Sequence, residues 1–293
     1  MNVDFGKIDL HMHTNVSDGT DTPEEIVSRV MEAGIGLFSV TDHDAVKSSQ
    51  MIAGNLPTAE LSFITGVEFS CKDEKGKYHI LGYGYDPNAE TIKNTVSYGH
   101  WLRMKKVRAR LDFLKQEFGF AFPEEELAEL MSLDNPGKPH IANMMVRNGY
   151  AETKEQAIRD FINKLHFRSE HLRPEEAIAG ILSSGGIPVL AHPSYGDGEQ
   201  YILGDEMEDR IRHLMDCGLR GLECFYSGFT PKLLNETLHF AEKFDLYVTA
   251  GSDYHGGNKL EKLGDTWLET GREQPPGLRK FLEDVRIVEG SSV

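Results

Sequence analysis

Two histidines one residue apart form the first group in the chain that could do chemistry. The apolar run at residues 8–12 predicts a short strand, whose alternate side chains share one face, so Asp9, His11 and His13 project to the same side. Two imidazoles on one face can bind a metal ion together. A lone pair of this kind is better explained by one buried and one surface histidine. Asp9 either orients an imidazole or is a solvated carboxylate at a strand end.

Residues of the same chemistry recur later, close to other predicted strands. Short apolar runs lead into His43, Glu68, His192, Asp253 and His255, and His79 lies inside another such run. The carboxyl ends of parallel strands in a barrel collect at one rim, so we expect these side chains to meet there. Imidazole and carboxylate ligands without thiolate suit zinc, manganese or iron, and a shared carboxylate such as Glu68 can bridge two ions. The pattern therefore favours a metal centre whose metal the sequence does not choose.

The elements that must position these residues alternate between strand and helix, with one interruption. Thr22, Pro23 and two following acids predict a helix that runs to about Ala33. Residues 99–171 instead predict successive helices, through 118, from 123, over 139–148 and over 153–165. We divide the chain into a first barrel part at 1–98, a helical insertion acting as a lid or substrate domain at 99–171, and a second barrel part at 172–293. About seven βα units imply an α/β fold with a parallel sheet, closed or distorted into a TIM-like barrel.

Charge and cysteine content narrow the choice of partners and location. The 293 residues include 31 Lys and Arg against 47 Asp and Glu, a formal net charge of −16, which is the wrong sign for long-range attraction to duplex DNA or an anionic membrane. Cys71, Cys217 and Cys224 form no CxxC pair, so a disulfide framework or a thiolate zinc site is not expected. Without a signal pattern or a long apolar run, we expect a soluble, cytoplasmic protein with no membrane partner.

The ordered motifs resemble those of the PHP family, named for polymerase and histidinol phosphatase. The resemblance covers the chain from end to end, and it implies a distorted (βα)7 TIM-like barrel holding two to three divalent ions of manganese, zinc or iron. The matching motifs are His11-Met12-His13 with Asp18, Thr41-Asp42-His43-Asp44, Glu68, His79, Ala191-His192-Pro193 and Gly251-Ser252-Asp253-Tyr254-His255.

The resemblance also implies which residues hold each ion. One ion would take His11, His13, Glu68 and Asp253. A second would share Glu68 and add His79 and His192. A third would take Asp18, His43 and His255, although many relatives have His where this chain has Asp18. That exchange would weaken or retune the third site, and an isolated Asp-Gly would otherwise be interpreted as a turn.

Basic residues of the insertion are the candidates for substrate binding. Lys138-Pro139-His140 resembles a segment of PHP phosphoesterases that act on nucleoside bisphosphates and 5′ ends of short RNA, where Arg usually replaces Lys138. The alternative is an ordinary helix start. Arg103, Lys106 and Arg110 would border an apolar helix stripe formed by Val107, Leu111, Leu114 and Phe118. They would either overhang a pocket or form a solvated face.

The resulting hypothesis is a metal-dependent phosphoesterase in which Glu68 helps two ions bind and direct a bridging hydroxide, while Asp253 or His255 protonates the leaving group. The resemblance implies a small nucleotide or sugar phosphate as substrate, first a nucleoside 3′,5′-bisphosphate or the 5′ end of a short RNA. Phosphoribosyl 1,2-cyclic phosphate is the rival within this class, and histidinol phosphate is disfavoured by the insertion. An amidohydrolase acting on C–N bonds would usually place a Lys where Glu68 stands. A metal-binding module without turnover is the remaining alternative.

Overall fold

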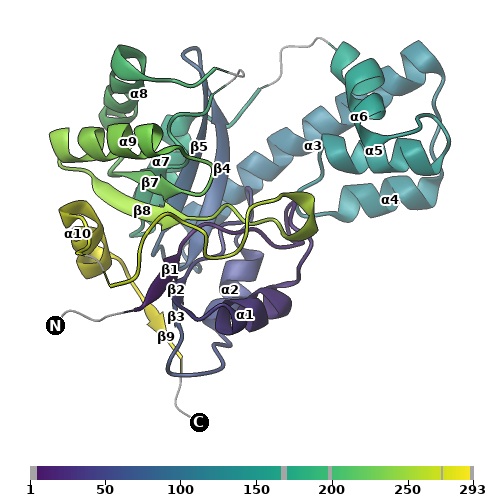
Figure 1. The fold of residues 1–293 in the computed structure, drawn as a ribbon. Helices are drawn as coiled ribbons and strands as arrows, with labels where there is room; N and C mark the ends of the chain where they lie inside the picture. The colour runs from purple at the N-terminus through teal and green to yellow at the C-terminus, as the bar shows by residue number, and fades with distance from the viewer. Residues whose placement is uncertain (1–4, 166–169, 197–199, 272, 291–293) are drawn as a thin grey trace. The chain divides into compact units, whose positions relative to one another are not determined.

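The computed structural model describes residues 5–165, 170–196, 200–271 and 273–290, and their helices and strands are shown in Figure 1. The chain divides into two compact units. The first consists of Met1–Val96 and Leu172–Val293, and the second of Ser97–His171. Each unit is described by itself below.

Four strands of the first unit form one sheet. Its order is β1 (Lys7–Asp9), β2 (Ile35–Phe38), β3 (Ser62–Phe63) and β9 (Val288–Glu289). The first two pairs are parallel and β9 runs antiparallel to β3. Helices α1 (Pro23–Glu32) and α2 (Lys47–Ala53) connect these strands. Thr22 caps α1 by accepting a hydrogen bond from the Glu25 backbone N–H while Glu25 accepts one from Thr22, so this predicted helix forms with the expected start.

Five strands form the second sheet, in the order β4 (Gly66–Lys72), β5 (Lys77–Tyr83), β6 (Ile187–Leu190), β7 (Gly221–Tyr226) and β8 (Tyr247–Gly251). The expectation of a wholly parallel sheet is wrong here, because β5 runs antiparallel to both of its neighbours. The physical reason is the short turn after β4. Asp73 accepts hydrogen bonds from the backbone N–H groups of Lys75 and Gly76, and so tight a turn can only reverse the chain.

Backbone hydrogen bonds link the segments of the two sheets beside the predicted metal ligands. Leu10 donates to Ala250 at 2.8 Å and Asp253 donates to His11 at 2.8 Å, while Glu68 donates to Asp42 at 3.3 Å. The described strands nevertheless belong to two separate sheets rather than to one closed ladder. The mixed α/β class is therefore confirmed, whereas the strand pairing recorded among the described residues does not itself establish a barrel.

Helices of the first unit pack on the sheets and cover a continuous apolar core. They are α7 (Pro174–Ser183), α8 (Gly204–Asp216), α9 (Pro231–Lys243) and α10 (Pro276–Asp284), with a short 3₁₀ helix at Gly256–Asn258 after β8. Ile8, Leu10 and Leu37 from the first sheet share this core with Leu81 and Val189 from the second. Buried apolar side chains therefore lie under the strand ends that carry the histidines, which holds those ends in place.

The second unit consists of helices around its own apolar cluster. The helix α3 (Glu90–Phe118) begins earlier than the expected residue 99, and α4 (Glu124–Ser132) and α5 (Lys138–Arg147) follow it. Instead of one helix over 153–165, the chain forms α6 (Lys154–Gln156), a π turn (Ala157–Phe161) and a 3₁₀ turn (Ile162–Lys164). Val107 and Leu114 are buried as expected, but Phe118 is 38% exposed because it ends the helix.

Candidate metal centre

Glu68 stands at the middle of a ring of imidazoles. Its Oε2 lies 3.4 Å from His11 Nε2, 3.2 Å from His13 Nε2 and 3.1 Å from His43 Nδ1. Its Oε1 lies 2.9 Å from His79 Nδ1 and 3.4 Å from His192 Nε2. The two oxygens thus face different groups, which is the arrangement that a carboxylate shared between two ions requires. Only 1% of the Glu68 residue surface is exposed, so its charge is almost fully withdrawn from solvent.

The strands place Glu68 and His79 within elements and the other ligands just beyond them. Glu68 lies inside β4, opposite Leu81 of β5, and not at a strand end as expected. His79 lies inside β5, where its backbone pairs with Ser70. His192 follows β6, and Asp253 and His255 follow β8. Because β5 extends past β6 at the end that carries His79, the His79 side chain still reaches Glu68.

Among the residues that the structure describes, three groups of ligand atoms lie close enough to hold ions. One consists of His11, His13 and Asp253, a second of His43, Glu68 and His79, and a third of His13, Asp18, His43 and His255. These groups overlap the sets implied by the resemblance but differ from them, because Glu68 is not in the first group and His13 joins the third. His43 approaches Glu68 as well as Asp18, and His192 belongs to none of the three groups although its Nε2 is near Glu68.

The chemistry of these side chains fits divalent ions. Within the part of the chain that the structure describes, four buried side-chain atoms of the candidate ligands have no hydrogen bond of acceptable geometry: Glu68 Oε1, His79 Nδ1, His192 Nδ1 and His255 Nε2. Buried polar atoms without a partner are costly and usually mark a missing ligand. Imidazole nitrogens and carboxylate oxygens are ligands of zinc, manganese and iron. The residues therefore fit the metal-binding role inferred for them.

Electrostatics within the cluster keep the carboxylates ionised. Burial would raise the pKa of Glu68, but the nearby His43 and His79 outweigh it and hold the pKa well below its usual range. Burial disfavours a charged His13, yet hydrogen bonds to Asp253 and Glu68 raise its pKa to about 9. Burial lowers the pKa of His43 to about 4 against the opposing charges of Glu68 and Asp18. Without metal, imidazolium groups therefore offset part of the carboxylate charge.

Glu223 is a functional residue that the sequence analysis missed. It is wholly buried in β7, and its Oε1 lies 2.8 Å from His11 Nδ1 while its Oε2 accepts the His192 backbone N–H at 2.8 Å. A carboxylate on Nδ1 fixes the imidazole tautomer and leaves Nε2 for a metal. Gly251 makes room for this pair, since a Cβ there would lie 2.2 Å from His11 Cβ. The sequence does carry a signal for this role, because Glu223 is a charged residue inside an otherwise apolar strand.

Two further buried carboxylates hold the backbone around the site. Asp9 accepts hydrogen bonds from the backbone of Ser252, at 3.0 Å, and of Gly264, at 2.7 Å. It is neither solvated nor bonded to an imidazole ring, so both earlier interpretations of Asp9 are wrong. Asp42 accepts hydrogen bonds from the Thr14 backbone at 2.8 Å and from the Ser17 hydroxyl at 2.6 Å, which fixes the loop that carries Asp18.

Asp253 is held in place from two directions. Its Oδ1 lies 3.4 Å from both His11 Nε2 and His13 Nε2. Its Oδ2 accepts a hydrogen bond from the Tyr226 hydroxyl at 3.0 Å and another from Lys259 Nζ at 2.7 Å. The backbone of Asp253 has a φ of 57°, a left-handed conformation that costs energy for a residue other than glycine and often occurs at functional sites.

The candidate substrate-binding residues all lie in the second unit. Arg103, Lys106 and Arg110 on α3 are half-buried, whereas Lys105 and Arg108 on the same helix are exposed. Burial lowers the pKa of Arg110, and the charge of Arg103 lowers it further. At the start of α5, His140 Nδ1 accepts the Gly137 backbone N–H at 3.2 Å and Lys138 Nζ donates to Asn163 at 2.6 Å. His140 is thus, at the least, part of a helix start.

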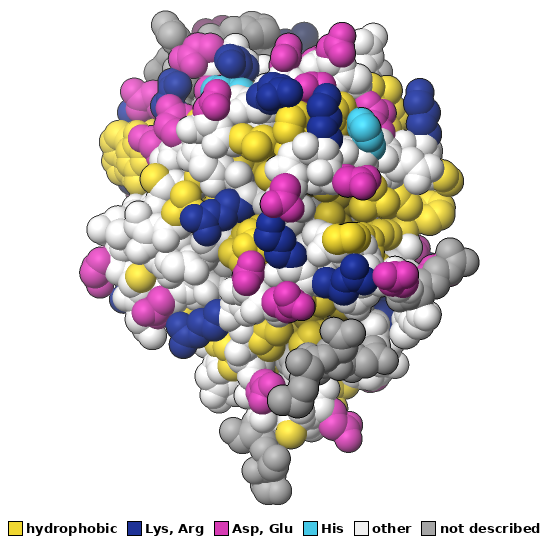
Figure 2. All heavy atoms as spheres, turned by 90° about the vertical axis from the view of Figure 1, so that its left-hand side faces the viewer, with side chains coloured by type: hydrophobic (Ala, Val, Ile, Leu, Met, Phe, Trp, Pro, Cys, Tyr) yellow, Lys and Arg dark blue, Asp and Glu magenta, His cyan; other side chains and the backbone are white. Residues whose placement is uncertain are grey.

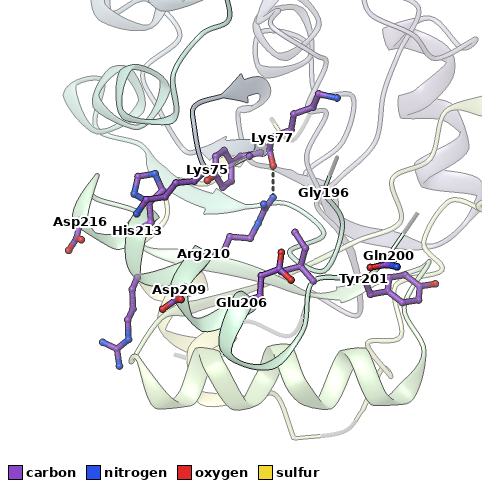
Figure 3. A pocket seen from close by; sticks show the side chains of 14 residues that line it. Lys75, Lys77, Gly196, Gln200, Tyr201, Glu206, Asp209, Arg210, His213 and Asp216 are labelled. Carbon is purple, nitrogen blue, oxygen red and sulfur yellow. Dashed lines mark hydrogen bonds between the residues drawn. The ribbon is translucent and has the colours of Figure 1, made fainter. Parts of the chain in front are cut away.

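A large hollow of about 700 Å³ lies outside the metal cluster, between α8 and the turn joining β4 to β5 (Figure 3). Arg210, labelled at its centre, donates to the Lys77 carbonyl at 2.6 Å, drawn as a dashed line, and its guanidinium covers the Tyr78 ring. His213 Nε2 lies 2.6 Å from Asp73 Oδ2. These lining groups are engaged with one another, so this hollow adds no ligand to the candidate metal centre.

Comparisons with known proteins point in one direction. Residues 9–167 match the model of the PHP domain family. The chain is 26% identical over 261 residues to the 3′,5′-nucleoside bisphosphate phosphatase of Chromobacterium violaceum, covering 86% of this chain and 88% of the relative. It is 27% identical over 260 residues to the phosphoribosyl 1,2-cyclic phosphate 1,2-diphosphodiesterase of Eggerthella lenta, covering 85% of this chain and 94% of the relative. It is 26% identical over 276 residues to the 5′-3′ exoribonuclease Rnm of Salmonella typhimurium, covering 90% of this chain and 91% of the relative.

A solved structure agrees with these sequence matches. A crystal structure from Bifidobacterium adolescentis, carrying the name of a metal-dependent phosphoesterase, matches with a TM-score of 0.73 and 27% identity, covering 95% of this chain and 96% of that chain. Among the described residues, no helix combines the length and the apolar character needed to cross a bilayer.

Proposed function

This chain belongs to the PHP domain family and hydrolyses phosphoesters, and we propose that its substrate is a nucleoside 3′,5′-bisphosphate or the 5′ end of a short RNA. The observation that carries metal-dependent hydrolysis is Glu68, whose two oxygens face separate groups of imidazoles. The names of the C. violaceum and S. typhimurium relatives support this choice of substrate class. We also propose that the two linked sheets form the distorted barrel implied by the family resemblance.

The residues that would hold two to three divalent ions are the nine of the cluster. Bound there, the ions would supply Lewis-acid stabilisation of phosphoryl oxygens and an activated water. The nine residues are His11, His13, Asp18, His43, Glu68, His79, His192, Asp253 and His255.

The protein's own groups prepare this site before any substrate arrives. Glu223 orients His11, and Tyr226 holds Asp253 with Oδ1 toward the imidazoles. Because both oxygens of Asp253 are engaged, we assign it to ligation, and His255 stays the candidate proton donor of the pair. Such preorganised groups lower the barrier because they need no rearrangement when charge develops at phosphorus.

For a bisphosphate, the second phosphate requires cations of its own. We assign this role to Arg103, Lys106, Arg110, Lys138 and His140 of the second unit. The half-buried positions of the α3 residues support an anion site, because a bound anion would offset the cost of withdrawing these positive charges from solvent.

Ring opening of phosphoribosyl 1,2-cyclic phosphate is the second candidate activity. The E. lenta relative carries that name at 27% identity, the same level as the other relatives. The same ligand cluster could serve both reactions, since each is an attack of water on phosphorus. Both candidate substrates carry a second phosphate, so the candidates differ in whether the reacting phosphate is an acyclic ester or a cyclic diester.

Hydrolysis of a panel of phosphoesters tests the proposal, with chromatography used to detect released phosphate, released nucleotide and the ring-opened product. The purified protein, supplied in turn with manganese, zinc or iron, is offered a nucleoside 3′,5′-bisphosphate, the two matching monophosphates, a short 5′-phosphorylated RNA and the cyclic ribose phosphate. We expect the highest kcat/KM with the bisphosphate or the RNA. Preference for the cyclic phosphate would replace the proposal with the second candidate, and turnover of none of them would refute the substrate class.

A further inference from the structure

We propose that Lys259 is a substrate-binding residue whose ammonium group contacts a phosphoryl oxygen at the reacting phosphorus. The inference deepens the proposed function and rests on it for the identity of the ligand. Lys259 follows the short 3₁₀ helix after β8, six residues beyond Asp253, and its Nζ lies 2.7 Å from Asp253 Oδ2. The sequence analysis did not predict a lysine beside Asp253.

The first step of the argument is that Asp253 is already oriented without Lys259. The Tyr226 hydroxyl donates to the same Oδ2 at 3.0 Å, and this tyrosine is 8% exposed in β7. The backbone N–H of Asp253 is held by the His11 carbonyl at 2.8 Å. A buried hydroxyl and a backbone bond therefore fix the carboxylate, so the lysine is not needed for its position.

The second step is that the ammonium is placed at the edge between the cluster and solvent. The Lys259 side chain is 39% exposed, while that of Asp253 is 5% exposed. An ammonium group carries three N–H donors, and one bond to Asp253 leaves capacity for oxygens of a ligand that enters from solvent. By its ordinary pKa the group is positively charged at neutral pH.

The third step is that the loop holding Lys259 is fastened on both sides. The Gly257 backbone donates to the Thr20 hydroxyl at 2.9 Å, and Asn258 donates to the Asp18 carbonyl at 2.7 Å. Beyond the lysine, the Gly264 backbone donates to Asp9 at 2.7 Å. The lysine therefore emerges from a segment tied to the loop of Asp18 and, through Asp9, to β1.

These placements explain how a strongly acidic chain can receive a phosphate dianion at its metal cluster. A cation within reach of Asp253 offsets the field of the surrounding carboxylates where the phosphoryl oxygens must lie. Charge-assisted hydrogen bonds from lysine to phosphate are among the stronger ones, so its loss should be measurable in both binding and turnover.

The test compares Lys259→Met and Lys259→Arg with Lys262→Met, which removes an exposed lysine of the same loop. Inorganic phosphate is the probe, titrated by calorimetry into the metal-loaded proteins, with bound metal measured by elemental analysis. We expect Lys259→Met to weaken phosphate binding and to lower kcat/KM for every phosphoester that the protein hydrolyses, each by about tenfold to a hundredfold. Metal content should be unchanged, Lys259→Arg should restore part of the binding, and Lys262→Met should resemble the wild type.

Two outcomes would overturn the inference. In the first, Lys259→Met loses metal while phosphate affinity per loaded protein is unchanged, which would make the lysine a positioning residue for Asp253. Tyr226→Phe, which removes a hydroxyl that positions Asp253, should show this behaviour. Unchanged metal, phosphate affinity and turnover would make it a surface lysine. Because phosphate binding is measured without turnover, the inference can stand or fall even when no phosphoester of the panel is hydrolysed, which separates its failure from that of the proposed function.

Discussion

At the scale of single residues, the negative charge of Glu68 is the feature on which the cluster depends. Its oxygens lie between 2.9 Å and 3.4 Å from ring nitrogens of five histidines. Two ions held close together repel each other, and a shared anion offsets that repulsion. Glu68→Gln keeps the volume and removes the charge, so we expect bound metal to fall and phosphate release to be lost. Elemental analysis beside an activity assay checks this, and full metal occupancy with normal turnover would refute the bridging role.

Glu223 supports the site through the residues it orients. Glu223→Gln removes the charge that fixes His11 but keeps an acceptor for the His192 backbone. We expect metal affinity to fall by about tenfold to a hundredfold, the usual effect of removing a partner of a ligating histidine. A metal titration in competition with a chelator measures it. Glu206→Gln, which changes an exposed glutamate on α8, is the matched control, and equal affinities in the two variants would count against the orienting role.

The sequence was informative about this scale wherever a residue type carries its own chemistry. Histidines and acids near apolar runs could be picked out, and the structure brings His11, His43 and Glu68 together. Glu223 could not be assigned, because the ring that it contacts, His11, is 212 residues away in the sequence. Lys259 could not be assigned, because it lies in a loop without periodicity. The prediction for Asp9 was wrong because the alternation of side chains along a strand shows which face a residue lies on, but not which backbone groups approach that face.

At the scale of elements, the loop between β1 and α1 carries Asp18 while being held by other residues. Asp42 bonds Thr14 and Ser17, and Asp21 bonds Arg29 and Tyr254. Asp18 itself is 40% exposed, with Oδ1 3.3 Å from His255 Nε2 and Oδ2 3.8 Å from His43 Nε2. The loop should therefore keep its conformation when the Asp18 carboxylate is removed.

Asp18→Ala should accordingly lose one metal equivalent and most of its turnover, while stability changes by less than about 0.5 kcal/mol once metal is removed from both proteins. Elemental analysis and thermal unfolding of the metal-free proteins check the two parts. Asp21→Ala is the contrasting variant, because it breaks bonds to Arg29 and Tyr254 and should lower the melting temperature with metal content unchanged. If Asp18→Ala shows that second behaviour instead, Asp18 is a structural residue of the loop.

Capping and turn chemistry explain which elements were predictable. The start of α1 follows from local bonds between Thr22 and Glu25, and a sequence displays such bonds directly. The antiparallel direction of β5 depends on a turn of a few residues at Asp73, and the alternation of strands and helices along the sequence does not predict such a turn. The π turn at Ala157–Phe161 has no local code that distinguishes it from a continuing helix, since one inserted residue is accommodated by tertiary packing.

At the scale of the whole molecule, the formal charge of −16 shapes how a phosphorylated substrate can bind. Acidic and basic side chains are interspersed on the face shown in Figure 2, with hydrophobic side chains between them, so that face presents no broad region of one sign. Long-range steering of a polyanion is therefore unfavourable, and each phosphate depends on cations placed locally. Metal ions would serve the reacting phosphate, and the second unit contains the cations assigned to a remote one.

A bisphosphate should consequently be a better substrate than the matching monophosphate, and the difference should depend on the second unit. Binding energy from the remote phosphate helps orient the reacting group, so its loss lowers kcat as well as affinity. We expect Arg103→Ala and Lys138→Ala each to cost about 1.5 to 3 kcal/mol for the bisphosphate, or about ten- to a hundredfold in kcat/KM, and to leave the monophosphate nearly unchanged.

The matched control for this prediction is Lys105→Ala, since Lys105 lies on the same helix but is exposed and paired with Glu170 at 2.6 Å. It should leave both substrates unaffected, because exposed ion pairs contribute little. Steady-state kinetics with both substrates for the wild type and the three variants give the comparison. If Arg103→Ala and Lys138→Ala lower the two substrates equally, or change neither, then these cations form a solvated face of the helices and the second unit does not select the substrate.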